Sequence, residues 1–164
     1  MRTGNLLLIA GWLAVAACGD DRVAGKAVLD GNKVLVQRYF NEVWNQGKTD
    51  LLDSLLEKDY INHTPSDTTV GKGREGLRRI IRAIRRGIPD IHYEIQDMIV
   101  TGDRVAVRLV VTGTQTDSLF VLPPTGRQVR VNQINIEEIV NGKISEHWRV
   151  TDELEMMKQL GFVK

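Results

Sequence analysis

Apolar residues recur at helical spacing in three segments of the first half of the chain. The first stripe follows Asp30-Gly31-Asn32, whose side chains suit a helix N-terminus, and it stops at Gly47. A short second stripe follows, and the third covers about residues 74–87. Spacing of three and four residues predicts three amphipathic helices. The stripes consist of Val36, Tyr39, Phe40, Val43 and Trp44, then Leu51, Leu52, Leu55 and Leu56, then Leu77, Ile80, Ile81 and Ile84.

The second half of the chain changes to alternating and β-branched residues, which predicts strands. Thr101-Gly102-Asp103 is expected to join the first two strands, and Asn141-Gly142, the strongest hairpin signal in the chain, the last two. A short helix ends the pattern. Three helices followed by such a meander predict an α+β fold, with the helices packed on one face of a curved antiparallel sheet that encloses a pocket. The expected strands cover residues 91–100, 105–112, 128–140 and 144–150.

Residues 1–17 have the pattern of an export signal. Arg2 precedes an apolar run from Leu6 to Ala17, which is short of the roughly 20 residues that span a bilayer but suits a signal-peptide core. The run ends at Cys18, the only cysteine, so no intrachain disulfide forms. Val15-Ala16-Ala17-Cys18 resembles a bacterial lipobox. We therefore expect cleavage before Cys18, lipidation of its thiol, and a bacterial cell-envelope protein that touches the membrane only through this lipid; the alternative is cleavage after Ala17 with a free thiol.

Residues 18–31 are polar and contain glycine, so they are expected to form a tether, and residues 32–164 the domain. The chain carries 22 basic and 21 acidic side chains, for a formal charge of +1. This balance does not indicate a nucleic-acid partner. The arginines between residues 74 and 86 lie off the apolar stripe of the third helix, which is typical of a solvated helix face.

Several motifs together resemble the SnoaL-like polyketide cyclase and ester cyclase family of the NTF2-like superfamily. They are Tyr60-Ile61-Asn62-His63, Pro124-Thr125-Gly126-Arg127, Asn141-Gly142-Lys143-Ile144-Ser145-Glu146-His147-Trp148, Asp152, and Gln159-Leu160-Gly161. The resemblance spans about residues 32–162. It implies a helix-lined cone around one pocket and acid/base chemistry without metal or organic cofactor. It also implies that Asp152, after the last strand, is the general acid/base. Asn135 departs from the histidine that relatives often carry there.

Asp152 is therefore the first candidate for catalysis, since an apolar cavity raises the pKa of a carboxyl toward neutrality. It also precedes Glu155 by three residues at a helix start, which is close to a capping box, so capping stays an equal alternative. His63 is the second catalytic candidate, and its alternative is a solvent-facing loop position.

Gln133 and Asn135 share one strand face with Val129 and Val131, and that face is expected to point into the cone as ligand-binding surface. Trp44 and Trp148 are expected in the core or pocket wall, with Trp148 on the same strand face as Asp152. His147 then falls on the opposite face, packed or exposed outside the cone. The chain's three histidines lack metal-ligand spacing, so no metal site is expected.

Two functions remain open at this point. One is a cofactor-free cyclase, isomerase or hydrolase that acts on a small apolar or carbonyl-containing molecule, with Asp152 as acid/base and His63, Gln133 and Asn135 orienting the substrate. The other is a non-catalytic, envelope-anchored module that binds a small ligand in the same cavity.

Residues 105–111 are apolar on both strand faces, which indicates a covered outer face and predicts a homodimer through the sheet.

Overall fold

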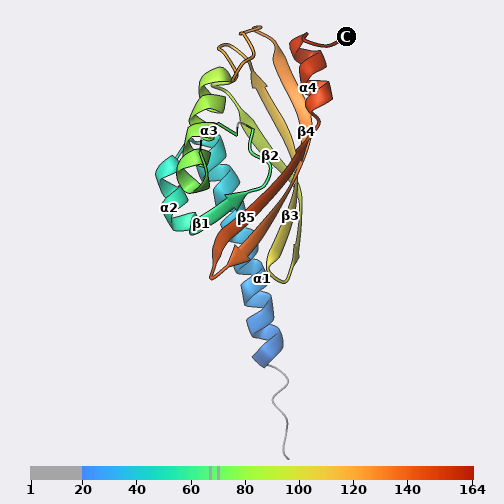
Figure 1. Cartoon of the computed structure of the whole chain (residues 1–164). Coiled ribbons are helices and arrows are strands. Elements are labelled where there is room, and N and C mark those ends of the chain that lie inside the picture. The colour runs from blue at the N-terminus through green and yellow to red at the C-terminus, as the bar shows by residue number, and fades with distance from the viewer. Residues whose placement is uncertain (1–19, 67, 70) are drawn as a thin grey trace, which may run out of the picture.

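A computed structural model describes residues 20–66, 68–69 and 71–164 (Figure 1). The expected signal peptide and Cys18 lie outside these residues. The chain forms α1 (Asp20–Arg38), the π-helix η1 (Tyr39–Asn45), the 3₁₀ turn η2 (Thr49–Leu51), α2 (Leu52–Leu55), β1 (Leu56–Asn62) and α3 (Gly73–Gly87). Four strands and a helix follow: β2 (His92–Thr101), β3 (Arg104–Thr114), β4 (Gln128–Val140), β5 (Lys143–Thr151) and α4 (Glu153–Leu160).

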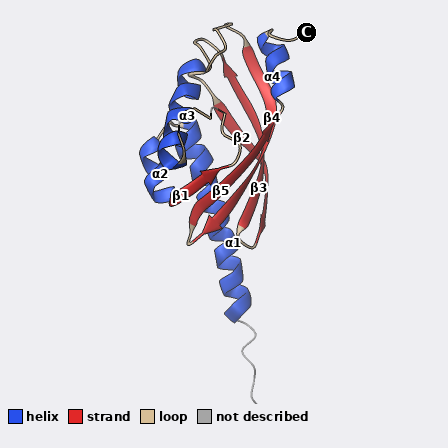
Figure 2. Cartoon of the chain, viewed as in Figure 1, coloured by secondary structure: helices blue, strands red, loops and turns tan. Residues whose placement is uncertain are grey.

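The five strands make one curved sheet in the order β1-β5-β4-β3-β2. The strands β2 to β5 form the predicted antiparallel meander, and α1, α2 and α3 cover one face of it (Figure 2). Asn141 and Gly142 both have positive φ, 51° and 73°, as a tight hairpin between twisted strands requires. The α+β architecture with helices on a curved sheet is confirmed.

Strand β1 is absent from the sequence-based prediction. It pairs in parallel with β5 at the edge of the sheet, through Leu56 with Ile144 and Asn62 with His147. Only Leu56 and Tyr60 of this strand are buried, because Glu57, Lys58 and Asp59 interrupt the alternation. A charged edge strand is common, since it discourages pairing with other chains. Its alternation was too weak to be recognised in the sequence.

The first helix also begins earlier than predicted, at Asp20 rather than after Asp30. Residues 24–28 of this helix are exposed. Its N-terminal turns extend beyond the end of the sheet that holds the β2–β3 hairpin (Figure 1), where Asn32 Nδ2 donates to Gly102 O at 3.2 Å. Alanine, lysine and leucine in this segment favour helix, and two glycines do not prevent it. The segment expected as a tether is therefore helical from Asp20 onward.

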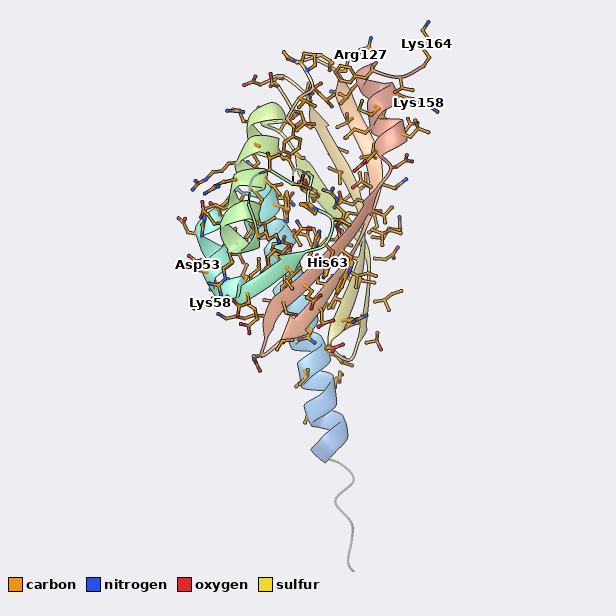
Figure 3. The ribbon with its side chains drawn as sticks, in the orientation of Figure 1. Asp53, Lys58, His63, Arg127, Lys158 and Lys164 are labelled. Atoms are coloured by element: carbon orange, nitrogen blue, oxygen red, sulfur yellow. The ribbon has the colours of Figure 1, made fainter. Side chains whose placement is uncertain are left out.

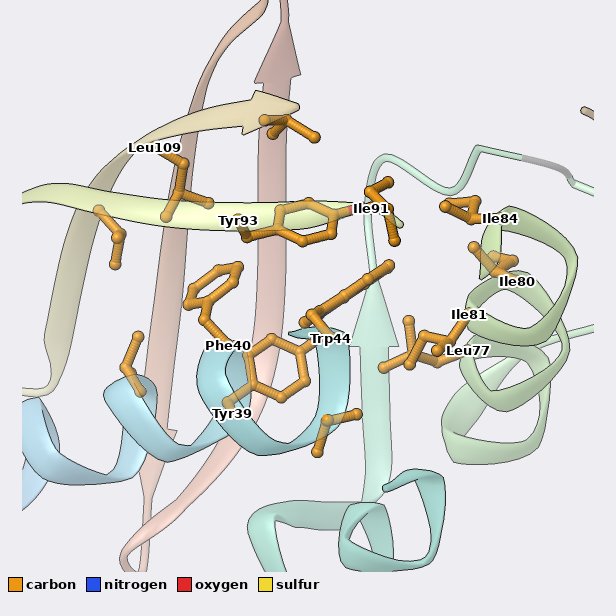
Figure 4. Packing of buried hydrophobic residues seen from close by; sticks show 14 of the residues in the cluster. Tyr39, Phe40, Trp44, Leu77, Ile80, Ile81, Ile84, Ile91, Tyr93 and Leu109 are labelled. Carbon is orange, nitrogen blue, oxygen red and sulfur yellow. The ribbon is translucent and has the colours of Figure 1, made fainter. Parts of the chain in front are cut away.

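The core lies between the helices and the inner face of the sheet. Aromatic rings from η1 meet β2, with Trp44 and Tyr93 centroids 5.1 Å apart, and the predicted apolar stripe of α3 closes the other side (Figure 4). Arg85 of α3 donates to Trp44 O and Asn45 O, both at 2.9 Å, and so satisfies carbonyl groups at the end of η1. This packing holds η1 and α3 at fixed positions over the sheet.

Candidate active site

A cavity of about 220 Å³ lies between α3 and the inner face of the sheet. Its walls come from α3, the following turn, β2, β3, β4, the loop at residues 119–122 and α4. Polar side chains line it as well, contributed by the loop after β1, by β4 and by the end of β5. Such a space suits a small apolar molecule with a few polar groups. The apolar lining is Ile84, Ile88, Ile91, Tyr93, Val111, Leu119, Phe120, Leu122, Val129, Val131 and Met156; the polar lining is Ser66, Gln133, Arg149, Thr151 and Glu153.

A narrow cleft adjoins this cavity and shares Ser66, Tyr93, Gln133 and Arg149 with it. The cleft has a volume of about 10 Å³, enough for roughly one water molecule or one carbonyl oxygen. It is also lined by three side chains that lie deeper in the cone, Trp44, Asn135 and His147. The cleft thus joins the apolar cavity to the buried polar side chains on the inner face of the sheet.

An acid and a base are buried together in the cone, Glu137 of β4 and His147 of β5. His147 Nδ1 lies 2.9 and 3.0 Å from the two carboxylate oxygens of Glu137, and the two side chains are 6% and 0% exposed. Burial raises the pKa of Glu137, and the nearby His147 opposes that rise. With Glu137 as acceptor, Nδ1 carries the hydrogen, and Nε2 is the nitrogen left for the cleft.

Gln133 and Asn135 point into the cone, as the alternation of β4 predicts. Gln133 Nε2 donates to Asn135 Oδ1 at 2.9 Å, and Thr151 Oγ1 donates to Gln133 Oε1 at 3.0 Å. These bonds fix the orientation of the Asn135 amide. Its Nδ2 is buried and has no hydrogen-bond partner, so a polar donor is available beside His147 in the cleft. Leaving such a group unpaired is costly, which is why buried donors of this kind often meet a ligand or water.

All three tyrosines of the chain, Tyr39, Tyr60 and Tyr93, are buried in this region. Burial is the main cause that raises the pKa of each one above its ordinary value. Glu137 adds to the rise at Tyr39 and Tyr60, while Arg149 opposes it at Tyr60 and Tyr93. The tyrosines therefore stay neutral and supply only hydroxyl groups to the interior.

Among the residues that the structure describes, Arg149 is the only cationic side chain that lines the cavity. Its backbone N–H donates to Thr64 Oγ1 at 2.7 Å, and its Nη1 donates to Ser66 Oγ at 2.8 Å. These bonds tie β5 to the loop after β1. They hold the guanidinium at the boundary between the cavity and the cleft.

Asp152 lies outside this cavity. It is the exposed N-cap of α4, where Oδ1 accepts from the backbone N–H of Glu155 at 3.1 Å. Of the two alternatives that the sequence left open, the geometry matches capping. The end of β5 presents Arg149 and Thr151 to the cavity instead.

His63 and Trp148 form a stack on the outer face of the sheet. Their ring centroids are 4.5 Å apart with 4° between the planes, and the Arg104 guanidinium lies 5.6 Å from the Trp148 ring centre. His63 Nε2 is 2.6 Å from Glu146 Oε2. The expected faces are therefore reversed: Trp148 is on the outer face and His147 is inside. Trp44 is buried beside Tyr93 and lines the cleft, in agreement with its predicted place in the core or pocket wall.

A β-bulge explains the reversal. From the tight Asn141-Gly142 turn, Val140 pairs with Lys143 and Ile139 with Ile144, but the register then shifts and Glu138 pairs with Glu146. Ser145 is the extra residue, and its hydroxyl donates to Glu138 O at 3.1 Å. One inserted residue moves every later side chain of β5 to the other face. A signal did exist in β4, because Glu137 lies on the inward face and a buried carboxylate needs a partner.

Among residues 20–66, 68–69 and 71–164, no group of three or more His, Cys, Asp or Glu side chains is placed to hold a metal ion. The polar groups that line the cavity and the cleft are amides, hydroxyls, the Arg149 guanidinium, the Glu153 carboxylate and the His147 imidazole, and Glu137 lies behind His147. None of the helices in the same part of the chain is both long enough and apolar enough to cross a membrane.

Comparison with known proteins identifies the relatives of this arrangement. The model of the SnoaL-like polyketide cyclase family matches residues 34–160. Aklanonic acid methyl ester cyclase DnrD of Streptomyces peucetius is 29% identical over 133 residues, which cover 77% of this chain and 88% of that protein. Nogalonic acid methyl ester cyclase of Streptomyces nogalater is 26% identical over 120 residues, or 72% of this chain and 89% of that protein.

Solved structures of similar proteins have the same fold as this chain. The structure of TsrD from Streptomyces laurentii superimposes with a TM-score of 0.73 at 29% identity and covers 80% of this chain and 96% of that one. The structure of IdmH from Streptomyces antibioticus, described as a putative polyketide cyclase, gives a TM-score of 0.68 at 30% identity, with 79% and 98% covered. The shared fold extends over nearly the whole length of both neighbours.

Proposed function

Because the chain belongs to the SnoaL-like polyketide cyclase family, we propose that it catalyses a cofactor-free, cyclase-type reaction on a small carbonyl compound. The reaction takes place where the cavity described above meets the cleft. The observation that carries this proposal is the buried Glu137–His147 pair, which lies beside the unpartnered Asn135 amide where the apolar cavity narrows to a cleft. Related proteins are named as cyclases of aklanonic and nogalonic acid methyl esters, which supports the reaction class.

Intramolecular aldol closure needs a base for a carbon next to a carbonyl group and a donor for the oxygen that becomes negative. In this proposal His147 Nε2 removes the proton, and Glu137 stabilises the imidazolium that results. Asn135 Nδ2 donates to the enolate oxygen. The carbanion then attacks a second carbonyl carbon, one C–C bond forms, and His147 returns the proton to the new alkoxide, so that the product is an isomer of the substrate.

The apolar walls serve this chemistry in two ways. They exclude water, which strengthens the hydrogen bonds to the developing oxyanion, and they fold the substrate so that its two carbonyl carbons meet. The cavity, at about 220 Å³, is below the usual range of roughly 300–1,000 Å³ for drug-sized ligands. A compact substrate with one or two rings fits this space better than a larger one.

The test compares two histidines on opposite faces of the sheet, His147 and His63. Purified protein is incubated with small diketones and with aklanonic and nogalonic acid methyl esters, and isomeric products are separated by chromatography. Once a substrate turns over, His147→Gln is expected to lower kcat by about 10²–10⁴, the usual cost of losing an acid/base group. His63→Gln is the same substitution on the outer face of the sheet, and it is expected to leave kcat unchanged.

Equal rates for wild type and His147→Gln would contradict the assignment of the base. Saturable binding of these compounds without turnover by any variant would contradict the enzyme proposal. It would favour the alternative, a ligand-binding module that uses the same cavity.

We further propose that Cys18 carries a lipid and anchors the protein in the bacterial cell envelope. The lipobox-like Val15-Ala16-Ala17-Cys18 supports this. The first turns of α1 would then act as a spacer of about 1.5 Å per residue between the lipid and the domain. Mass spectrometry of the mature N-terminus tests the proposal, and an intact Met1 or an unmodified Cys18 on membrane-derived protein would contradict it.

We propose a second copy of this chain as the partner of the outer sheet face. Exposed apolar side chains lie there on β2, β4 and β5, and they are flanked by the ion pairs Arg104–Glu138 and Arg108–Asp97. Both charge signs on one patch allow a two-fold, self-complementary contact. Light scattering is expected to show a dimer, and Val150→Asp a monomer; a wild-type monomer across the micromolar range would contradict it. The apolar residues are Ile99, Ile134, Ile136 and Val150.

A further inference from the structure

We propose that Arg149 makes the cavity selective for a ligand that carries a free carboxylate. The substrate class is then an apolar carbonyl compound with an ionised acid group. This inference rests on the proposed function for the location of the substrate. It adds a specificity that the family assignment does not contain.

The position of Arg149 favours such a contact. Its side chain is 17% exposed and comes from the inner face of β5, and it lines both the apolar cavity and the cleft. A guanidinium offers five N–H donors. Among the described residues, its only hydrogen-bonded partner is Ser66 Oγ at 2.8 Å. Most of its donors therefore remain for another group.

Within the part of the chain that the structure describes, the charge of Arg149 also has little balance. The acidic group near it is Glu153, 3.9 Å from Nη2, which is too long for a hydrogen bond. Arg78 provides a comparison within the same chain. It is 12% exposed, yet it contacts three carboxylates, those of Asp50, Asp53 and Glu75, and it donates to Thr49 O at 2.6 Å.

Two similarly buried arginines thus have different surroundings. A buried cation without a close counter-ion is costly, so a ligand anion at Arg149 would supply what the protein supplies to Arg78. The planar guanidinium matches a carboxylate in a two-point hydrogen-bonded geometry. The apolar walls beyond it match the rest of an organic acid. The similar cyclases named above are named for methyl esters, in which the carboxyl is uncharged.

The experiment measures binding of a matched pair of probes, 2-naphthoate and methyl 2-naphthoate, to the full domain by isothermal titration calorimetry. Wild type is expected to bind 2-naphthoate about 10- to 100-fold more tightly than the ester, which is the usual contribution of a hydrogen bond to a charged group. Arg149→Gln is expected to remove that preference, and Arg149→Lys to keep part of it. Arg82→Gln, on the exposed face of α3, is the matched control and is expected to keep all of it.

A wild-type preference for the ester, no saturable binding of 2-naphthoate at millimolar concentration, or an unchanged preference in Arg149→Gln would overturn the inference. Circular dichroism of each variant confirms that loss of binding is not loss of fold, and Arg149→Lys keeps the test valid if Arg149→Gln is unstable. Calorimetry measures binding without turnover, so it reports the carboxylate preference independently of catalysis. Failure of the carboxylate preference and failure of turnover are therefore separate results.

Discussion

Two histidine–glutamate pairs lie on opposite faces of the same sheet. His147 and Glu137 are 6% and 0% exposed on the inner face. His63, which is labelled in Figure 3, and Glu146 are 37% and 32% exposed on the outer face. Their contact distances are similar, 2.9 Å and 2.6 Å. The surroundings of the two pairs differ. Water and salt screen the interaction between the charges of the outer pair, whereas the inner pair lies in an apolar interior, where the charges that a proton transfer creates are not screened.

The comparison shows that the residue types alone do not identify the candidate site. Both pairs join a histidine to a carboxylate, and both involve β5. The bulge at Ser145 decides which histidine points inward. A site made of ordinary residues thus depends on one irregularity of the backbone.

The largest difference between the two faces is expected in stability. Glu137→Ala leaves His147 buried without its partner, and removal of one member of a buried pair costs about 3–5 kcal/mol of unfolding free energy. Glu146→Ala is expected to cost under about 1 kcal/mol, because the exposed pair is screened. Urea unfolding of both variants measures the difference. Equal losses of unfolding free energy in the two variants would show that burial does not make the inner pair stronger than the outer pair.

An alkaline titration tests how dry the inner region is. Burial raises the pKa of Tyr39, Tyr60 and Tyr93, whereas tyrosines of the unfolded chain ionise near pH 10. Above about pH 10 the folded state therefore binds more protons than the unfolded state. Stability is unaffected below that pH and falls as pH rises above it, by about 1.4 kcal/mol per pH unit for each tyrosine.

Ultraviolet absorbance of tyrosinate provides the measurement. No tyrosine is expected to ionise near pH 10 while the domain is folded, and all three are expected to ionise together when it unfolds. A gradual transition near pH 10 in folded protein would mean that water reaches at least one of these rings. The inner region would then not differ from the outer face in the way described.

The smallest effect is expected at Asp152, which lies between the two faces at the start of α4. Asp152→Ala removes the side chain that accepts from Glu155 N and is expected to cost about 1 kcal/mol of unfolding free energy. Asp152→Asn keeps a good capping group and is expected to cost only a few tenths of a kcal/mol. Thermal unfolding of both variants measures these costs. A loss in Asp152→Asn as large as in Asp152→Ala would mean that the charge, and not the cap, matters.

Much of the fold could be predicted from local patterns. The stripe of α3 and the hairpin at Asn141-Gly142 follow from residue spacing and turn chemistry, and both are present. Unbroken alternation along β4 correctly placed Gln133 and Asn135 inside the cone. These features depend only on neighbours in sequence, which is why they could be found without a structure.

The candidate site could be predicted only in part. A bulge at Ser145 has no glycine or proline to indicate it. Simple alternation, with Trp148 on the same face as Asp152, therefore predicts Trp148 inside and His147 outside. The family resemblance implies Asp152 as the base, with capping as the alternative, and in the structure the chain turns into α4 there and uses the carboxylate as a cap. Both differences arise from backbone geometry at the two ends of β5.

The central claim is that chemistry takes place at His147 on the inner face and not at Asp152. The most direct test is the initial rate of ring closure by wild type, His147→Gln and Asp152→Asn on one substrate at neutral pH. We predict that His147→Gln is slower by about 10²–10⁴, the usual cost of a lost acid/base group, and that Asp152→Asn is as fast as wild type. A slow Asp152→Asn together with a wild-type rate for His147→Gln would contradict the account.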